Sequence, residues 1–202
     1  MPKPRRDKRV KILSHRTPYR GHFKLEVYRL KHKLYRGGWS QRFQREIFER
    51  GDAVGILLYD PKRDAIVMVE QFRLAAYLAS YNPWQLEVPA GIIDRKSESP
   101  ADVAKREALE ETGIAIAGRP KRAFRVMTTP GGSTETYELF VANVDSNQAK
   151  GLHGLAAENE DIKVVVKRVP ALMRMLKAGR IPNGPSALAL YWFAVHRAKF
   201  RR

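Results

Sequence analysis

The residues best suited to chemistry are three glutamates in one short stretch, Glu107, Glu110 and Glu111. If the stretch is helical, their i, i+3 and i+4 spacing places at least two carboxylates on one face. Carboxylates held that close repel one another, and a hard divalent cation relieves the repulsion. The chain contains no cysteine and this stretch contains no histidine, so oxygen is the available donor. The pattern therefore predicts a magnesium or manganese site rather than a zinc site.

The sequence around these glutamates has the start and stop signals of a helix. Ser99 suits the N-cap, Pro100 the first helical position, and Asp102 a carboxylate that reaches back to the cap. Gly113 can end the helix in a left-handed conformation. We therefore expect a loop from Gly91 that leads into an acidic helix.

A Glu-rich helix can also be a solvated surface on which Lys105 and Arg106 pair with the carboxylates, and charge alone favours that interpretation. The order of the residues is more specific. Gly91 is followed by six residues, Glu98, seven residues, and then Arg106-Glu107-Ala108-Leu109-Glu110-Glu111-Thr112-Gly113-Ile114. This loop and helix resemble the signature of the Nudix hydrolase family. The family usually has five residues between the glycine and the first glutamate, so the loop here is one residue longer.

Stretches outside the helix resemble the bacterial ADP-ribose pyrophosphatases within that family, and the similarity extends from about Tyr19 to Phe193. Pro130, sixteen residues after Ile114, matches a marker of that group. The other matching stretches are Arg45–Gly51, Glu70–Tyr77, Glu87–Gly91, Thr129–Gly132 with Glu135, and Gly151–Gly154 with Glu158–Ile162. The resemblance implies an α/β (α+β) fold: a Nudix α/β/α sandwich with a mixed sheet, plus a small N-terminal antiparallel β-sheet domain.

The resemblance also implies a role for each matching residue, with two or three Mg²⁺ ions (or Mn²⁺) per site and Glu158 as the general base. The metal ligands would be the Ala90 carbonyl, Glu107, Glu111 and Glu160, with Glu110 as a further contributor. Substrate contacts would come from Arg45, Glu46, Arg50 and Arg73, from Thr129, Pro130, Gly131 and Glu135 of a second subunit, and from His22 and Phe23 beside adenine.

Simpler interpretations exist for several of these residues. Arg45 and Arg50 could be surface charges on a strand, and Glu135 could be solvated. We expect Arg106 to orient the loop by pairing with Glu98 rather than to touch the substrate.

The reaction implied is the metal-dependent hydrolysis of the pyrophosphate of ADP-ribose to AMP and ribose 5-phosphate. Clustered carboxylates suit it, because bound cations neutralise the pyrophosphate and lower the pKa of a bound water. An enzyme of the same fold acting on another nucleoside-diphosphate sugar, such as GDP-mannose, is the nearest alternative. A non-catalytic ADP-ribose-binding sensor, or a basic RNA-binding protein with this fold, is the alternative of another class.

Length and composition restrict the class of protein. The chain has 202 residues, of which 44% are hydrophobic, enough for one main domain and a small appendage. It has no apolar run long enough to span a membrane and no apolar segment of a signal peptide. The absence of cysteine excludes disulfides and fits a reducing compartment. We therefore expect a cytoplasmic protein without membrane partners.

The net charge of +17 is concentrated at the two ends of the chain. Residues 1 to 20 contain eight Lys or Arg and one Asp, and residues 181 to 202 contain four basic and no acidic residues. No aromatic interleaving or recognised motif accompanies the basic residues, so specific nucleic-acid binding is not expected. Residues 1–20 are predicted to be a basic flexible arm.

The remaining elements follow from hydrophobic periodicity. Alternation over 23–32 and 40–48, broken by Arg36-Gly37-Gly38, predicts a hairpin within an N-terminal subdomain at 21–50. A short hairpin cannot form a core alone, so we expect it to be exchanged within a homodimer. The Nudix hydrolase domain would then occupy 51–202. In it, strands are predicted at 53–59, 65–72, 84–89, 124–127, 136–144 and 162–169, and helices at 170–178 and 186–200.

Overall fold

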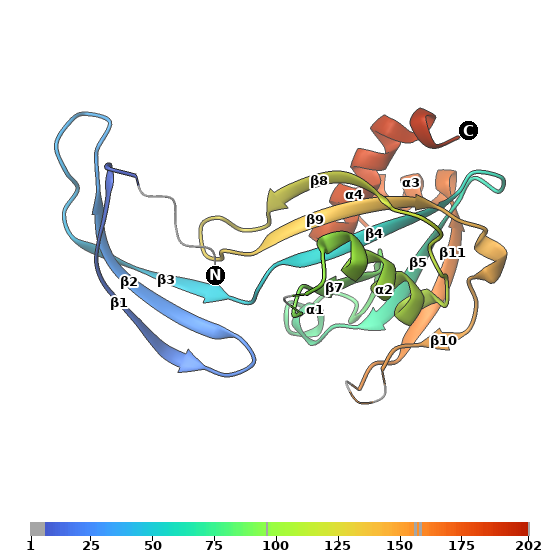
Figure 1. The fold of residues 1–202 in the computed structure, drawn as a ribbon, viewed down its shortest axis with the longest axis horizontal. Coiled ribbons are helices and arrows are strands. Elements are labelled where there is room, and N and C mark those ends of the chain that lie inside the picture. Colours follow the sequence, from blue (N-terminus) through green and yellow to red (C-terminus); the bar gives the residue numbers. More distant parts are fainter. Residues whose placement is uncertain (1–6, 96, 156, 158, 202) are drawn as a thin grey trace. The chain divides into compact units, whose positions relative to one another are not determined.

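The computed structural model describes residues 7–95, 97–155, 157 and 159–201. It contains two β-sheets, one of three strands and one of eight (Figure 1). Mixed α and β structure and the small antiparallel sheet agree with the predicted fold class. In the described ranges no helix is both long and apolar enough to cross a membrane.

The small sheet has the order β1-β2-β3, and its strands are β1 (Val10–Arg20), β2 (Lys24–His32) and β3 (Phe43–Glu49). β2 and β3 pair antiparallel with Lys24 opposite Glu49 and Leu30 opposite Phe43, as expected for the predicted hairpin. Gly37 and Gly38, in the connection between them, have φ values of 88° and 74°, which glycine adopts without steric cost.

The prediction of a flexible arm is wrong for residues 10–20. These residues form β1, which pairs antiparallel with β2 from Val10 opposite His32 to Arg20 opposite Lys24. Composition pointed to a solvated tail because the segment is strongly basic. Its backbone hydrogen bonds, however, are satisfied by β2. His15 also stacks on Tyr28, with 4.4 Å between ring centroids, and lies 2.8 Å from the buried carboxylate of Glu26.

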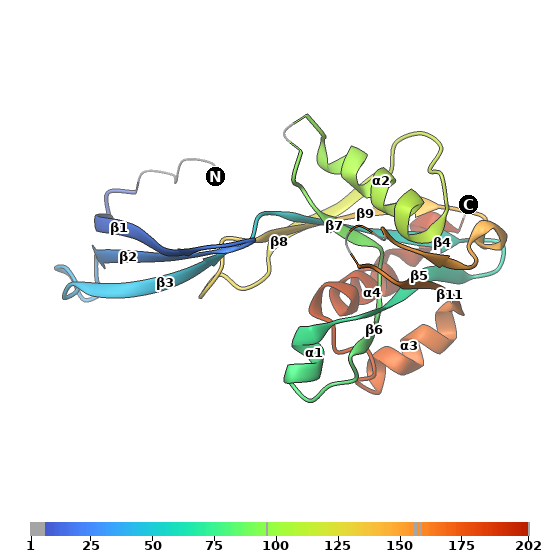
Figure 2. The ribbon, with the colours of Figure 1, turned by 90° about the horizontal axis from the view of Figure 1, so that it is seen from below.

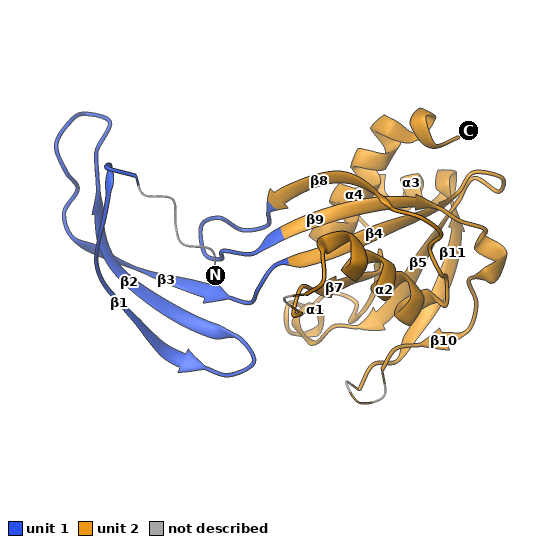
Figure 3. Cartoon of the chain, in the orientation of Figure 1, with its two compact units in different colours: residues 1–52, 127–136 blue, residues 53–126, 137–202 orange. Residues whose placement is uncertain are grey.

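The chain divides into two compact units that differ from the predicted domain boundaries. The first comprises residues 1–52 and 127–136, and the second comprises residues 53–126 and 137–202 (Figure 3). The segment 127–136 was expected in the Nudix domain. It joins the first unit because the Phe48 amide donates to the Gly132 carbonyl at 2.8 Å and Thr136 donates to Asp52.

The large sheet has the order β10-β11-β5-β4-β9-β8, with β6 paired to β5 and β7 to β4. It is a mixed sheet because β4 and β9 run parallel whereas β4 and β5 run antiparallel. Its strands are β4 (Ala53–Asp60), β5 (Ala65–Phe72), β6 (Trp84–Glu87), β7 (Ala90–Ile92), β8 (Lys121–Met127), β9 (Thr136–Asn143), β10 (Leu152–His153) and β11 (Ile162–Arg168).

Helices cover both faces of this sheet (Figure 2). They are α1 (Leu74–Leu78), α2 (Pro100–Thr112), α3 (Val169–Lys177) and α4 (Gly184–His196), with short 3-10 turns η1 (Ser146–Gln148) and η3 (Arg197–Phe200). Because strand side chains alternate, β4 contributes to two cores. Ile56 and Leu58 belong to the core beneath α2, whereas Leu57 and Tyr59 belong to the core beneath α3 and α4. This is the expected α/β/α sandwich.

Candidate functional site

Helix α2 begins and ends where the sequence predicts. The Ser99 side chain accepts from the Asp102 amide, and the Asp102 side chain accepts from the Ser99 amide at 3.1 Å, which is a capping box. Pro100 occupies the first turn, and Gly113 ends the helix with a φ of 73°. These local signals fix the register of the helix. They thereby fix which of its glutamates face the sheet.

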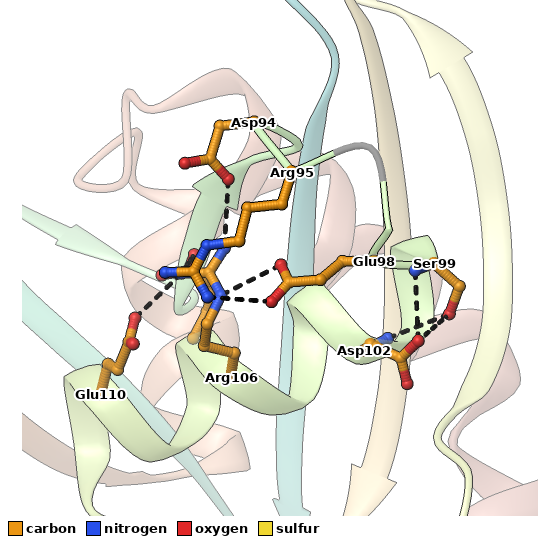
Figure 4. A network of polar contacts seen from close by, with 8 residues as sticks. Asp94, Arg95, Glu98, Ser99, Asp102, Arg106 and Glu110 are labelled. Carbon is orange, nitrogen blue, oxygen red and sulfur yellow. Dashed lines mark hydrogen bonds and ion pairs between the residues drawn. The ribbon is translucent and has the colours of Figure 1, made fainter.

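Arg106 ties the preceding loop to the helix (Figure 4). Its guanidinium lies 3.3 Å from Glu98 and 3.0 Å from Glu110, with Asp94 at 3.7 Å. The expected Arg106–Glu98 pair is therefore confirmed. Arg95 also pairs with Glu98 at 3.1 Å. The longer loop is thus held by two arginines that share one carboxylate.

Glu107 and Glu111 point into the protein rather than to solvent, with exposed fractions of 9% and 4%. The Ala90 amide donates to Glu111 Oε2 at 3.2 Å. A Cβ built on Gly91 would lie 2.0 Å from Glu107 Oε1, so a larger residue there would displace this carboxylate. Two carboxylates from α2 therefore lie against the backbone of β7.

The electrostatic environment disfavours negative charge on both residues. Burial raises the pKa of Glu107 to about 7; Arg106, 2.8 Å away, opposes the shift, and the charges of Glu110 and Glu160 add to it. Burial, then the charge of Glu107, raises the pKa of Glu111 well above its ordinary value. Glu160 and Arg73 also act on Glu111, in opposite directions. Burial and like charges together therefore outweigh the nearby arginines.

These donors fit a divalent cation. Buried carboxylates that repel one another are stabilised by a hard cation, and their oxygens are the ligands that Mg²⁺ and Mn²⁺ prefer. The charge of Glu160 acts on both carboxylates, and its Oε2 accepts from the Leu155 amide at 3.2 Å. Within the described ranges, no three acidic or histidine side chains are already gathered in the geometry of a metal site. Glu158, the expected base, lies outside the described residues.

Arg73 is held by Glu87, a carboxylate for which the sequence predicts no role. Glu87 is buried, and its two oxygens accept from Arg73 Nε at 3.2 Å and Nη2 at 2.7 Å. Gln71 and Asn183 also donate to Glu87, at 3.2 Å and 2.7 Å. Glu87 lies in the matching stretch Glu87–Gly91 without a predicted role of its own, and no sequence signal indicates Asn183.

The first unit brings together four of the other predicted site residues. Arg50 Nε lies 3.2 Å from Glu135, and its guanidinium lies over the ring of Phe23 at 5.6 Å. The His22 and Phe23 rings pack edge to face, with 4.5 Å between centroids. Glu135 also accepts from Thr128 at 2.7 Å, so it is bonded rather than solvated. The cluster combines aromatic surface with a cation and an anion.

The remaining predicted residues do not join this cluster through any contact seen in the described parts. Arg45 lies over the ring of Phe43 at 4.6 Å, and Glu46 is an exposed residue of β3. Thr129 closes a turn, because its carbonyl accepts from the Gly132 amide at 3.0 Å. Pro130 and Gly131 are exposed in that turn.

The fold and the acidic helix define a class of protein: an α/β/α sandwich with a site of carboxylate oxygens between strand β7 and the capped helix α2. A family model described as the NUDIX domain matches residues 49–185. The chain belongs to the Nudix family. A solved structure described as an ADP compounds hydrolase has the same fold, with a TM-score of 0.72 and 19% identity over 98% of this chain and 100% of that one.

Characterised relatives are similar over most of their length. The ADP-ribose pyrophosphatase of Escherichia coli is 45% identical over 187 residues, which cover 93% of this chain and 88% of the relative. The ADP-ribose pyrophosphatase of Haemophilus influenzae is 44% identical, covering 96% and 89%. The GDP-mannose pyrophosphatase of Shigella flexneri is 35% identical over 150 residues, covering 74% and 76%.

Proposed function

We propose that this protein is a hydrolase that cleaves the pyrophosphate of ADP-ribose to AMP and ribose 5-phosphate with the help of Mg²⁺ or Mn²⁺. The observation that carries the reaction class is the pair of buried carboxylates, Glu107 and Glu111, against the backbone of Ala90 and Gly91. The choice of substrate is supported by 45% identity to an ADP-ribose pyrophosphatase over 93% of the chain.

Glu107, Glu111, Glu160 and the Ala90 carbonyl would hold the cations, with Glu110 as a further donor. The bound cations supply charge neutralisation for the pyrophosphate and lower the pKa of water. Arg106 pairs with Glu110 at 3.0 Å and with Glu107 at 2.8 Å, so a bound cation would compete with this arginine for both carboxylates.

Glu158 is the proposed base. Glu158 does not belong to α2, the helix that supplies the proposed metal ligands Glu107 and Glu111. It is therefore available to take a proton from the attacking water. A positioned base of this kind contributes about 10²- to 10⁴-fold to the rate.

Arginines are the proposed contacts of the substrate anion. Arg50 and Arg73 have planar groups that suit phosphate or ribose oxygens, and Arg45 and Glu46 are further candidates. The Phe23 ring and His22 offer a surface for adenine, and Arg50 is already in contact with that ring.

We further propose a cytoplasmic homodimer in which Thr129, Pro130, Gly131 and Glu135 approach the substrate of the other subunit. The three-stranded sheet supports it. Its β1 exposes Val10, Ile12, Leu13 and Tyr19, which is apolar area available for an interface.

A hydrolysis panel tests the substrate. We expect a higher kcat/KM for ADP-ribose than for GDP-mannose, NADH or diadenosine polyphosphates, each assayed with and without Mg²⁺. GDP-mannose is the second candidate because of the 35% identical relative. A higher kcat/KM for GDP-mannose would overturn the choice of ADP-ribose, and metal-independent binding without turnover would indicate a sensor.

A further inference from the structure

Glu87 is the centre of a buried polar cluster, and of its members the proposed function uses only Arg73. It is 5% exposed, and its three donors come from two separate parts of the second unit. Gln71 belongs to β5, Arg73 follows that strand directly, and Asn183 precedes α4. A buried carboxylate needs such partners, since an unpaired one is costly.

The geometry of Arg73 shows what the cluster controls. Glu87 binds the Nε and Nη2 edge of the guanidinium and leaves Nη1 without an acceptor among the described residues. The side chain remains 44% exposed, and the charges of Glu111 and Glu160 act on it. Glu87 therefore fixes the plane of a guanidinium whose charge interacts with Glu111 and Glu160 of the proposed metal site.

Asn183 has two tasks at once. Its Oδ1 accepts from the Ser186 amide at 3.0 Å, which caps α4, and its Nδ2 donates to Glu87 Oε1 at 2.7 Å. The cap fixes the side chain, so the amide group is presented to Glu87 in one orientation. Asn183 and Glu87 are 96 residues apart in the sequence.

We infer that Asn183 is a positioning residue for substrate binding, because it orients the Glu87 carboxylate that in turn aims Arg73 at the substrate phosphate or ribose oxygens. The inference deepens the proposed function and rests on it for the identity of the substrate. The helix α4 cap thereby becomes part of the recognition of a nucleoside-diphosphate sugar, although Asn183 itself touches no substrate.

The variant Asn183→Ser separates the two tasks. Serine caps helices about as well as asparagine, but it is too short to donate to Glu87. Only part of the lost hydrogen-bond energy passes on to Arg73, so we expect KM for ADP-ribose to rise roughly three- to thirty-fold with little change in kcat. Asn183→Thr, another capping residue, repeats the test if Asn183→Ser fails to fold.

Ala194→Gly is the matched control. Ala194 is exposed in the same helix, so glycine weakens α4 without touching Glu87. We expect it to lower Tm and leave KM unchanged. Equal increases in KM for Ala194→Gly and Asn183→Ser would show that α4 acts only through general stability, and would overturn the inference.

A double-mutant cycle tests the route through Glu87. In a Glu87→Ala background, Asn183→Ser should change KM by less than about twofold, because the acceptor through which Asn183 acts is gone. Effects that simply multiply would contradict the inference.

The orientation of Arg73 can also be measured without turnover. The ¹⁵Nε–H signal of Arg73, assigned by its loss in Arg73→Lys, should exchange slowly with solvent in the parent and several-fold faster in Asn183→Ser. An unchanged signal refutes the positioning role. If the parent fails to hydrolyse ADP-ribose but the Arg73 Nε–H still exchanges faster in Asn183→Ser than in the parent, the proposed substrate is refuted. The positioning of Arg73 then remains supported.

Discussion

Replacing Glu107 by glutamine should stabilise the metal-free protein at alkaline pH while weakening its affinity for metal. Glutamine has nearly the same shape but cannot ionise. It removes the negative charge that burial and the charges of Glu110 and Glu160 disfavour. The prediction follows because a binding site for a cation holds its carboxylates in a geometry that costs stability when the cation is absent.

The size of the effect follows from the pKa. The Glu107 pKa rises from 4.5 to about 7 on folding. A shift of this size corresponds to about 3 kcal/mol, at 1.36 kcal/mol per pKa unit. Since folding raises this pKa, the folded state binds the proton more tightly. The contribution of this pKa shift to the free energy of unfolding is therefore fully present below about pH 4.5 and is lost as pH rises through about 7.

The assay is thermal unfolding in the presence of a chelator at pH 5 and pH 8.5. For a chain of this size, about 3 kcal/mol corresponds to roughly 6 to 12 °C in Tm. Glu107→Gln should exceed the parent by up to that amount at pH 8.5 and by much less at pH 5. Added Mg²⁺ should raise the Tm of the parent more than that of Glu107→Gln.

Glu110→Gln is the matched control, because Glu110 also pairs with Arg106 at 3.0 Å but is more exposed than Glu107. We expect it to change stability by less than about 1 kcal/mol, as is usual for partly exposed ion pairs. A Glu107→Gln variant that is no more stable than the parent at pH 8.5 would refute the reasoning.

Four further outcomes are expected. Glu158→Gln should bind Mg²⁺ and ADP-ribose nearly normally but lose about 10²-fold or more in kcat; near-normal kcat would move the base to another residue. Gly91→Ala should lose activity, because its Cβ would lie 2.0 Å from Glu107 Oε1 and displace this carboxylate; full activity in a variant whose crystal structure shows Glu107 displaced would contradict its role. Asp60→Ala should lower the free energy of unfolding by about 3 kcal/mol, since the buried Asp60 accepts from the Ser146 hydroxyl at 2.6 Å and from its amide at 3.0 Å; urea denaturation measures it, and a loss below 1 kcal/mol would contradict the burial argument. Light scattering should give the mass of a dimer, and a fully active monomer would remove the shared substrate site.

Local signals in the sequence determined the acidic helix. The Ser99 cap, Pro100, Asp102 and Gly113 act within one or two turns, and all four have their predicted positions in α2. The pairing of Arg106 with Glu98 also follows from short-range spacing. Features that depend on neighbours in sequence were therefore predictable from sequence.

Features that depend on distant partners were not predictable. β1 reads as a basic tail because its stability comes from pairing with β2 and from the contact between His15 and Glu26. The short elements α1, β7 and β10 contain too few residues to show a period. Asn183 meets Glu87 only because α4 packs on the face of the sheet next to the end of β6.

The central claim is tested most directly by product analysis of the full chain with ADP-ribose. We expect equal amounts of AMP and ribose 5-phosphate in the presence of Mg²⁺, and no release when EDTA is present. Glu111→Gln should greatly reduce the rate at low Mg²⁺ and recover part of it at high Mg²⁺, because the variant loses a ligand rather than the base. Release of AMP that is unaffected by EDTA and by Glu111→Gln would contradict the account.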